Sequence, residues 1–491
     1  MQAAAPTPNS SPGRDVRSDP AATLPCLFGR EHRLTYGQYD IRDAAGELVA
    51  SAARAPRLLQ LRMLEQAALS GPALRQIPDD QWMSLLEKSG KTFASGEDAV
   101  CWAGLVSRSS GLPRARVLKA YATLRSDLAR MHETLTAQAP NGNADSFRCG
   151  RDAARSWRLV PQGRHLAVRI PGNFPTININ WLISLALRRP VLLCASLQDP
   201  FTPYRLAQSL YEAGVPENSI SLCFHDAELF WQSADQVLMS GDPPTGVRRE
   251  SHHLHLYHHG RSKAVLAGCT MSRSVAARLA LQAVQGCGRL CTNVSAVLAD
   301  EGVNAAAEEL ASALSAFQIL PLDDQRAVVP SFPDRQAALA IAARISAAVA
   351  RGARDVTAKI TGRPLVTDTA EGVFLRPTLL LVKADDAIFG SEFPFPFVTV
   401  ANVPASEFLR RCRNSLAVSV VGGKRELIQD LICEPTIDKV FWGDDFDHGY
   451  DPAEPHEGFL ADFLFRKKVV FDYADEQYCR SGARIDSLLS D

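Results

Sequence analysis

The sequence predicts an α/β protein whose parallel sheets are covered by helices. From residue 157 onward, short β-branched runs alternate with helical segments, which is the pattern of βαβ units joined by right-handed crossovers. Between residues 51 and 137, apolar side chains recur at spacings of three and four, which is typical of several amphipathic helices. A chain of 491 residues is long enough for two or three packed units.

The elements of both α/β halves can be placed in chain order. The first half is expected to contain a strand and turn at 157–175, a helix at 179–189, a strand at 190–196, a helix ending near Gly214, a strand at 219–224, a helix around 226–234 and a strand at 236–241. The second is expected to contain two strands around a turn at 253–268, a helix closed by Gly286, a strand at 293–300, an Ala-rich helix at 334–351, strands within 373–402 and a helix–strand unit through 405–421. The alternation in the first half is consistent with nucleotide binding.

Five segments are predicted along the chain. Residues 1–25 lack a continuous apolar run and are rich in Pro, Ser, Asp and Arg, which favours a disordered tail. After the tail we expect a mostly helical N-terminal segment at 26–150, a nucleotide-binding α/β domain at 151–262, a second α/β domain at 263–430 and a C-terminal segment at 431–491.

Composition also limits the kinds of partner. The formal net charge is −1, so no bulk attraction to nucleic acid or an anionic membrane surface is expected. Eleven scattered cysteines lack the dense pairing of a secreted disulfide scaffold, which favours a reducing cytoplasm. The most apolar stretch, 179–197, is interrupted by Arg188, Arg189 and Pro190, and is too short for a membrane span of about 20 uninterrupted residues.

Two cysteines, Cys287 and Cys291, follow the helix closed by Gly286. A free cysteine is more often a small buried apolar residue than a nucleophile. However, "GRLCT" at 288–292 resembles the Gly-Gln-x-Cys-Thr nucleophile motif of the aldehyde dehydrogenase superfamily, which selects Cys291. Six further segments resemble that superfamily in the right order: 170–175 (IPGNFP), 189–222, 237–247 (VLMSGDPPTGV), 372–380 (GVFLRPTLL), 391–400 (SEFPFPFVTV) and 414–422 (NSLAVSVVG).

The resemblance implies a fold and, through one departure, a reaction. The implied fold has a Rossmann-type cofactor-binding domain, an α/β catalytic domain at 263–430 and a helical N-terminal segment, and residues 431–491 return to the cofactor and oligomerisation region. The superfamily's general-base glutamate aligns with Tyr257 in "YHHGRSK". Without a base, water attacks a thioacyl-enzyme slowly. This combination resembles the acyl-CoA reductase branch, which includes the fatty-acyl reductase component of bacterial luminescence, as do "WMSLLEKSGKTF" and "PHEGFLADFLF".

The resemblance also implies catalytic roles. Cys291 would attack the thioester of an acyl-CoA, and a reduced nicotinamide would deliver hydride to the acyl-enzyme and release an aldehyde. The Asn173 amide and a backbone N–H near Cys291 would stabilise the oxyanion, an effect of about 3–4 kcal/mol per donor in other acyl-transfer enzymes. The alternative for Asn173 is a turn residue before Phe-Pro.

Cofactor residues follow from the same resemblance, since no Gly-x-Gly-x-x-Gly loop is present. Ser240 and Gly241 match the turn near the cofactor phosphates, and Glu392 matches the carboxylate that holds the nicotinamide-side ribose. Ser196 lies within 194–197, where the superfamily often has Lys-Pro-Ser-Glu at the adenosine ribose. The missing glutamate removes repulsion against a 2′-phosphate, so NADPH is favoured and NADH remains possible.

The run SHHLHLYHHG at 251–260 would place alternate histidines on one face of a strand. Histidines at this spacing can chelate a metal, but the sequence identifies no convergent cysteine or carboxylate, and no metal site is predicted. A structural role and proton transfer by His258 or His259 remain open.

Three functions compete: an acyl-CoA reductase, an aldehyde-oxidising dehydrogenase whose base comes from elsewhere, and a catalytically silent homologue that serves as a binding scaffold. The absent glutamate favours the first over the second, and the presence of Cys291 and Asn173 argues against the third. The resemblance further implies a homo-oligomer that exchanges a β-hairpin, and a partner protein that delivers the acyl group is a possibility.

Overall fold

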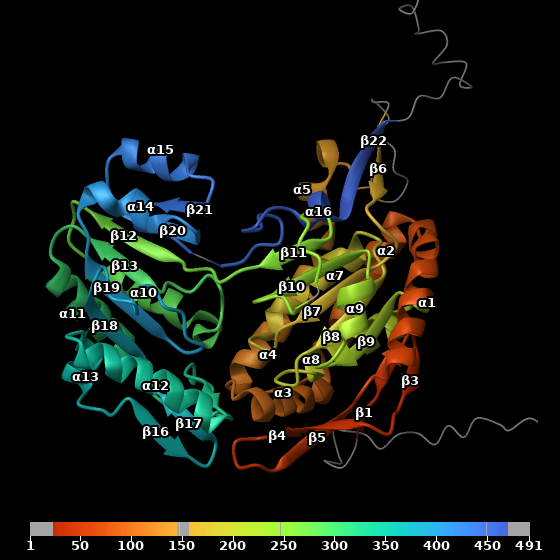
Figure 1. Ribbon diagram of the computed structural model, residues 1–491, viewed down its shortest axis with the longest axis horizontal. Helices are drawn as coiled ribbons and strands as arrows, with labels where there is room; N and C mark the ends of the chain where they lie inside the picture. Colours follow the sequence, from red (N-terminus) through yellow and green to blue (C-terminus); the bar gives the residue numbers. More distant parts are fainter. Residues whose placement is uncertain (1–22, 145–146, 148–156, 246, 448, 470–491) are drawn as a thin grey trace, which may run out of the picture.

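The computed structural model describes residues 23–144, 147, 157–245, 247–447 and 449–469. The predicted disordered tail therefore lies outside the described residues up to position 22, whereas Thr23–Leu24 already forms strand β1. The predicted α/β class is confirmed: two seven-stranded sheets lie side by side, each covered by helices (Figure 1).

The first sheet has the strand order β11-β10-β7-β8-β9-β2-β3. Its strands are β7 (Leu166–Ile170), β8 (Val191–Ala195), β9 (Ile220–Phe224), β10 (Gln236–Ser240), β11 (Leu254–Tyr257), β2 (Cys26–Phe28) and β3 (Glu31–Arg33). The five strands β7–β11 are parallel, as the alternating pattern predicts. The sequence did not predict that β2 would extend this sheet antiparallel to β9.

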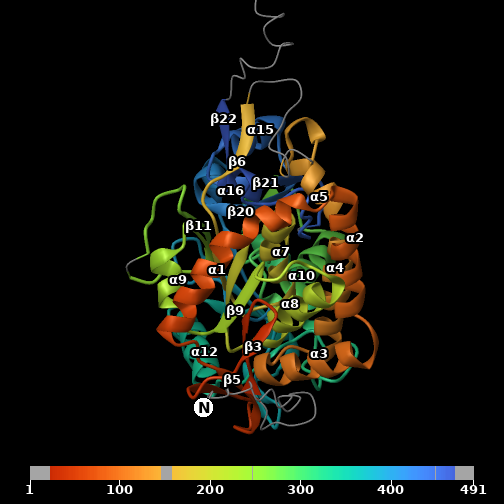
Figure 2. The same ribbon diagram turned by 90° about the vertical axis from the view of Figure 1, so that its right-hand side faces the viewer.

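Helices from two parts of the chain cover this first sheet. They are α1 (Arg57–Gln76), α2 (Asp79–Phe93), α3 (Gly96–Ser110), α4 (Arg114–Ala129) and α5 (Met131–Gln138), then α7 (Ile179–Ala186), α8 (Phe201–Ala213) and α9 (Glu228–Ser233). Viewed from the side, α1 crosses in front of the strands, whereas α2 and α4 stand beside them at the right (Figure 2). Helix α8 ends at Gly214, whose φ of +112° is a conformation that glycine adopts without strain.

The second sheet has the order β15-β18-β19-β13-β12-β20-β21. Its strands are β12 (Lys263–Ala267), β13 (Ala296–Ala299), β15 (Arg354–Asp355), β18 (Thr378–Lys383), β19 (Phe397–Asn402), β20 (Ser415–Gly422) and β21 (Ile437–Trp442). Its helices are α10 (Arg273–Val284), α11 (Val303–Ser315), α12 (Arg335–Ala350), α13 (Val356–Thr361), α14 (Phe408–Cys412) and α15 (Arg425–Cys433). Because β21 pairs with β20, this sheet continues past residue 430.

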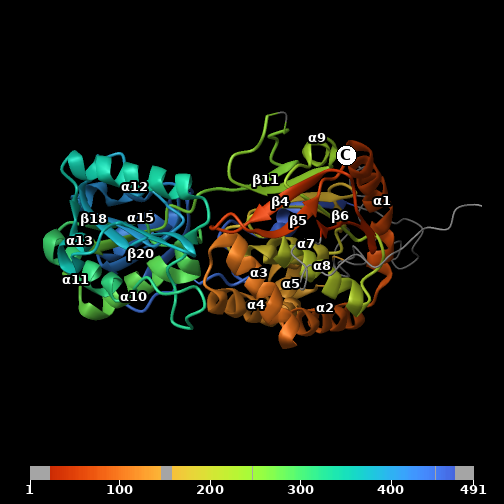
Figure 3. The ribbon, with the colours of Figure 1, turned by 90° about the horizontal axis from the view of Figure 1, so that it is seen from below.

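The two strands expected around a turn at 253–268 do not pair with each other. Strand β11 pairs with β10 in the first sheet, whereas β12 lies between β13 and β20 in the second. Residues 258–262 therefore carry the chain from one half to the other, and the two halves are distinct when seen from below (Figure 3). The alternating apolar pattern is shared by both strands, so it could not distinguish a hairpin from a crossing between sheets.

Three small sheets complete the described part of the chain. They are β1-β5-β4 with β5 (Leu48–Ala53) and β4 (Gln38–Arg42), β14-β17-β16 with β14 (Ser331–Phe332), β17 (Gly372–Leu375) and β16 (Val366–Thr369), and the pair β22 (Phe465–Val469) and β6 (Trp157–Pro161). The last pair projects from the first half beside the short helix α16 (Leu460–Leu464) (Figure 1). Within the described ranges, no helix combines the length and apolar character needed to cross a bilayer.

Candidate active site

The loop that carries Cys291 begins with a left-handed turn. After α10, Gly286, Cys287 and Gly288 have φ values of +53°, +62° and +74°. A Cβ at position 288 would lie 2.4 Å from the backbone of Phe395, a distance that no side chain tolerates. Glycine therefore lets the loop pass directly against the segment that precedes β19.

Asn293 holds this loop to the end of α10. Its Oδ1 accepts a hydrogen bond from the Leu290 N–H (2.6 Å), and its Nδ2 donates to the carbonyl oxygens of Gln282 (2.6 Å) and Gln285 (2.9 Å). Leu290 and Asn293 lie on either side of Cys291 in the sequence. The three bonds therefore fix the backbone on both sides of the predicted nucleophile, each with a net contribution of about 1 kcal/mol.

Arg289, two residues before Cys291, is buried and donates only to carbonyl oxygens. Its Nη1 donates to Ser110 (2.8 Å), its Nη2 to Ser331 (3.0 Å) and its Nε to Pro394 (3.2 Å). Burial lowers the pKa of the guanidinium to about 10, so it stays charged at neutral pH. Ser110 ends α3 in the first half, so Arg289 joins the loop to both halves.

Asn173, the predicted oxyanion donor, contacts the same loop. Its Nδ2 donates to the carbonyl oxygen of Arg289 (2.8 Å), and its Oδ1 is buried without a hydrogen-bond partner among the described residues. A primary amide has two N–H groups, so the second one remains available to a ligand. Burial raises the pKa of the Cys291 thiol, and the backbone N–H groups of Cys291 and Thr292 partly oppose that rise, which indicates that they face the sulfur. Donors for a developing oxyanion are therefore present at this loop.

The two cysteines of the loop differ in accessibility. Cys287 is 1% exposed, whereas Cys291 is partly exposed. The pKa of each thiol is raised to about 12, mainly by burial and, at Cys291, also by the carboxyl groups of Glu457 and Glu392. Because the thiolate is the nucleophilic form, Cys291 must transfer its proton before it can attack. Only Cys291 is placed where a substrate can reach it.

The crossing segment 258–262 packs against the nucleophile loop. Gly260 contacts the backbone of Cys291, and the Ser262 hydroxyl donates to the Cys291 carbonyl oxygen (3.2 Å). Between them, Arg261 has a φ of +47°, a left-handed conformation that is uncommon for a residue with a side chain. Such strain often occurs at functional sites.

Glu392, predicted to bind the nicotinamide-side ribose, is held by the crossing segment. The backbone N–H of Arg261 donates to its Oε1, and the Nδ1 atom of His259 lies 3.4 Å from its Oε2. Burial raises the pKa of the carboxyl group, and these neighbours partly oppose that rise. The carboxylate is thus fixed at the junction of the two halves, within electrostatic range of Cys291.

The remaining predicted cofactor residues lie at one edge of the first sheet. Ser196 directly follows β8, Ser240 ends β10, and the N–H of Gly241 donates to the Tyr257 carbonyl oxygen (3.1 Å). Parallel strands bring these ends together. Gly241 has a φ of +75°, and a Cβ there would meet no atom within 4 Å. Open space at this strand end fits the phosphates of a dinucleotide, and the crossing segment connects it to Glu392.

Glu457 is a candidate functional residue that the sequence reasoning missed. Together with Tyr257 and Tyr450, it lines a narrow cavity between the first half and the C-terminal segment. Burial, followed by the charge of Asp438, raises the pKa of the Glu457 carboxyl to about 8. The segment PHEGFLADFLF was noted for its resemblance to the acyl-CoA reductase branch. No periodicity in it indicates that Glu457 lies near Cys291.

The histidine run forms β11 and its flanks. His253 lies 2.9 Å from the Asp235 carbonyl oxygen through its Nδ1, and the His255 ring packs between Tyr257 and Phe463, with centroids 4.8 and 5.4 Å apart. Across the described ranges, no cluster of three or more side chains is arranged to bind a metal. These contacts support a structural role for His253 and His255, whereas His259 lies at Glu392.

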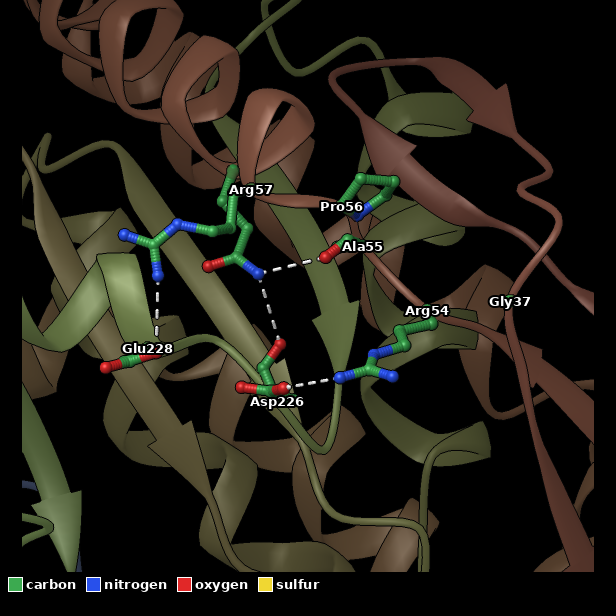
Figure 4. Close-up of a pocket in the computed structure, with 8 residues that line it drawn as sticks. Gly37, Arg54, Ala55, Pro56, Arg57, Asp226 and Glu228 are labelled. Carbon is green, nitrogen blue, oxygen red and sulfur yellow. Dashed lines mark hydrogen bonds and ion pairs between the residues drawn. The ribbon is translucent and has the colours of Figure 1, made fainter.

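A second pocket, of about 370 Å³, lies at the start of α1 beside the residues that follow β9 (Figure 4). Arg54 and Arg57 approach Asp226 and Glu228 respectively, with a nitrogen–oxygen distance of 3.4 Å in each pair. The N–H of His225, which precedes Asp226, donates to the Ala195 carbonyl oxygen (2.8 Å). This pocket therefore adjoins the strand end that carries Ser196.

Residues 38–423 match the model of the aldehyde dehydrogenase family. The chain belongs to this family. The match covers most of both halves, including the Cys291 loop and Glu392. A search among curated proteins finds no significant match, so family membership rests on the family model and the fold.

Solved structures of other members share the fold of this aldehyde dehydrogenase family protein. A Bacillus cereus aldehyde dehydrogenase in complex with NAD+ has a TM-score of 0.74 at 16% identity, covering 91% of this chain and 96% of that one. Indole-3-acetaldehyde dehydrogenase AldA of P. syringae, in complex with NAD+ and IAA, also has a TM-score of 0.74 at 16% identity, with 91% and 95% covered. A 3,6-anhydro-L-galactose dehydrogenase in complex with NADP has a TM-score of 0.72 at 16% identity, with 91% and 99% covered.

Proposed function

We propose that this protein is an oxidoreductase that uses NAD(P)H to reduce an acyl-CoA to an aldehyde through a thioacyl-enzyme on Cys291. The observation that carries the proposal is the surroundings of this thiol. Tyr257 stands where the superfamily has its water-activating glutamate, and the Glu457 carboxyl, with a pKa of about 8, is mostly protonated at neutral pH. A thioester without an ionised base beside it reacts slowly with water, so it survives until it is reduced.

The chain's own residues account for the acyl-transfer step. The Cys291 sulfur, after losing its proton, attacks the thioester carbonyl carbon, and the CoA sulfur leaves and takes up a proton. The second N–H of Asn173 and the backbone N–H of Cys291 stabilise the negative charge on the carbonyl oxygen. The bound nicotinamide cofactor supplies hydride, and Glu392 orients the ribose next to it. Collapse of the resulting thiohemiacetal releases the aldehyde and regenerates the Cys291 thiol.

We propose NADPH as the preferred cofactor. The strand end that carries Ser196 has Leu197 where the superfamily often has a glutamate, so no carboxylate there would repel a 2′-phosphate. Arg54 and Arg57 lie in the adjoining pocket (Figure 4). Their guanidinium groups suit charge-assisted bonds to a phosphate, which would compete with Asp226 and Glu228 for them.

Oxidation of an aldehyde is a second candidate, and Glu457 is the observation that favours it. Once ionised, this carboxyl could activate water against the acyl-enzyme and release a carboxylic acid. Its raised pKa, about 8, means that this route would require alkaline conditions.

We also propose that the protein forms a homo-oligomer through β6 and β22. These two strands pair only with each other among the described strands, and an isolated two-stranded ribbon is marginally stable in water. Pairing of its free edge with a second copy would complete the sheet. Sedimentation of the full chain tests this assignment, and a monomer at micromolar concentration would exclude it.

The function is tested by incubating the protein with acyl-CoAs of increasing chain length and either NADPH or NADH, while cofactor absorbance and aldehyde are measured. Equimolar cofactor oxidation and aldehyde formation are expected, and the Cys291→Ala variant is the inactive control. Reduction of NADP+ by aldehydes at about pH 9, without any acyl-CoA reduction, would instead establish the oxidising candidate.

A further inference from the structure

A cationic groove of about 630 Å³ lies in the second half, beside Glu392. It is lined by segments from α12, the loop 384–392, α14 and the crossing segment. Six cationic side chains face three carboxylates there; the cations are Arg261, Lys263, Arg344, Arg410, Arg411 and Arg413. The volume lies within the range of small-molecule sites, and the excess of positive charge indicates an anionic ligand.

The three carboxylates are already engaged. Asp385 pairs with Arg411, Asp386 with Arg351 (2.9 Å), and Glu392 with the His259 ring (3.4 Å). Three of the six cations are also paired: Arg411 with Asp385, Arg410 with Glu407 and Arg413 with Glu434.

Three cations have no carboxylate at ion-pair distance within the described ranges. The Arg344 guanidinium is held over the Phe393 ring, with its carbon 4.8 Å from the ring centroid. Lys263 is buried, and its Nζ donates to the Arg261 carbonyl oxygen (3.0 Å) and to the Ser415 hydroxyl. Burial lowers the pKa of Lys263 to about 8, so a bound anion would favour its charged form. The Arg261 side chain is exposed next to them.

The groove lies next to the loop that carries the Cys291 thiol. Its inner end is formed by His259 and Arg261, on either side of Gly260, which contacts the backbone of Cys291. Its lining residues lie between 259 and 413 and include Glu392, the residue assigned to the nicotinamide-side ribose, whereas the predicted phosphate edge of the dinucleotide belongs to the first sheet. A phosphate-bearing substrate could therefore occupy the groove before the cofactor ribose is placed at Glu392, while its uncharged end reaches toward Cys291.

We propose that this groove binds the phosphate groups of the CoA moiety, while the uncharged pantetheine arm extends toward Cys291. The inference rests on the proposed function, because the groove would bind the CoA part of the proposed acyl-CoA substrate. CoA carries a diphosphate and a 3′-phosphate, and arginine guanidinium groups recognise such oxygens through paired, charge-assisted hydrogen bonds.

The test is the dissociation constant of unacylated CoA, measured by calorimetry on the full chain and compared with that of pantetheine, which lacks the phosphates. CoA should bind at least ten-fold more tightly, and the difference should shrink as salt is raised. Arg344→Gln and Arg261→Asn should each weaken CoA binding by about ten-fold without changing pantetheine binding. Asparagine is chosen at 261 because it tolerates a positive φ.

The matched control is Arg335→Gln. Arg335 is also on α12, but it pairs with Asp368 outside the groove, so this change should leave CoA binding unaltered. Equal affinities for CoA and pantetheine, or CoA binding that is unchanged in both groove variants, would overturn the proposal. Reduction of an acyl-pantetheine by the unaltered protein tests the proposed function separately, because that substrate has no phosphates for the groove.

Discussion

A Cβ atom at position 260 would lie 1.7 Å from the carbonyl oxygen of Cys291. The crossing between the two sheets and the nucleophile loop therefore share space that only glycine leaves free. Because the Gly260 carbonyl oxygen also accepts a hydrogen bond from the Leu416 N–H (2.6 Å), the crossing segment cannot easily move away.

We expect Gly260→Ala to displace the Cys291 loop and to slow acylation at least 100-fold, since a shift of about 1 Å can cost that much. Acylation is measured by intact mass after exposure to acyl-CoA without cofactor. Gly104→Ala is the control, because a Cβ at that helical position meets nothing within 4 Å. A Gly260→Ala variant that acylates at the normal rate would show that the loop tolerates the displacement.

The two cysteines should respond differently to removal of their sulfur. Cys291→Ala is expected to abolish the acyl adduct and aldehyde formation, whereas Cys287→Ala should retain both, because Cys287 is buried in a left-handed turn. Peptide mapping of the adduct distinguishes the two sites. An adduct that persists in the Cys291→Ala protein would remove this residue from the mechanism.

The loss of acyl groups to water should depend on pH through Glu457. Its pKa is raised to about 8, so the carboxyl is protonated at pH 7 and becomes an available base only above about pH 8. Without reduced cofactor, hydrolysis of the acyl-enzyme should therefore accelerate as pH rises from 7 to 9. Glu457→Gln should remove that acceleration, about ten-fold or more at pH 9. A rise in free acid that is the same in both proteins would assign the base to another group.

Arg54→Gln should weaken NADPH binding by about ten-fold while NADH binding changes little, because only NADPH has the 2′-phosphate that this guanidinium would contact. Fluorescence titration of both cofactors measures the difference. Arg42→Gln serves as the control, since that arginine pairs with Asp40 away from the pocket. Equal losses for NADPH and NADH would place Arg54 at a part that the two cofactors share.

Local patterns were sufficient for most of the fold but not for its long-range joins. Helix α8 and strands β7–β10 follow from apolar spacing and from Gly214, because those signals are contained within each element. The placement of β2 beside β9 was not predictable, since edge pairing depends on surfaces far apart in the chain. Likewise, β11 and β12 were predicted as two strands around a turn, because neither strand's sequence indicates that the two belong to different sheets.

The candidate site shows the same division. Cys291 and Asn173 were predicted from motifs that surround them in the sequence, and in the structure Asn173 contacts the Cys291 loop through the Arg289 carbonyl oxygen. Glu457 approaches that loop from a distant segment, and its raised pKa arises from burial rather than from its neighbours in sequence. The partners of Arg289, at positions 110, 331 and 394, could not be predicted from any local pattern either.

Those partners of Arg289 imply an order of events during synthesis of the protein. On the ribosome, Cys291 emerges when Ser331 and Pro394 have not yet been added to the chain, so two of the three carbonyl groups that anchor its loop do not exist. The loop then has its contacts with α10, Asn173 and Ser110, but not the two later anchors. The set of contacts that holds the Cys291 loop is therefore complete only after translation has passed residue 394.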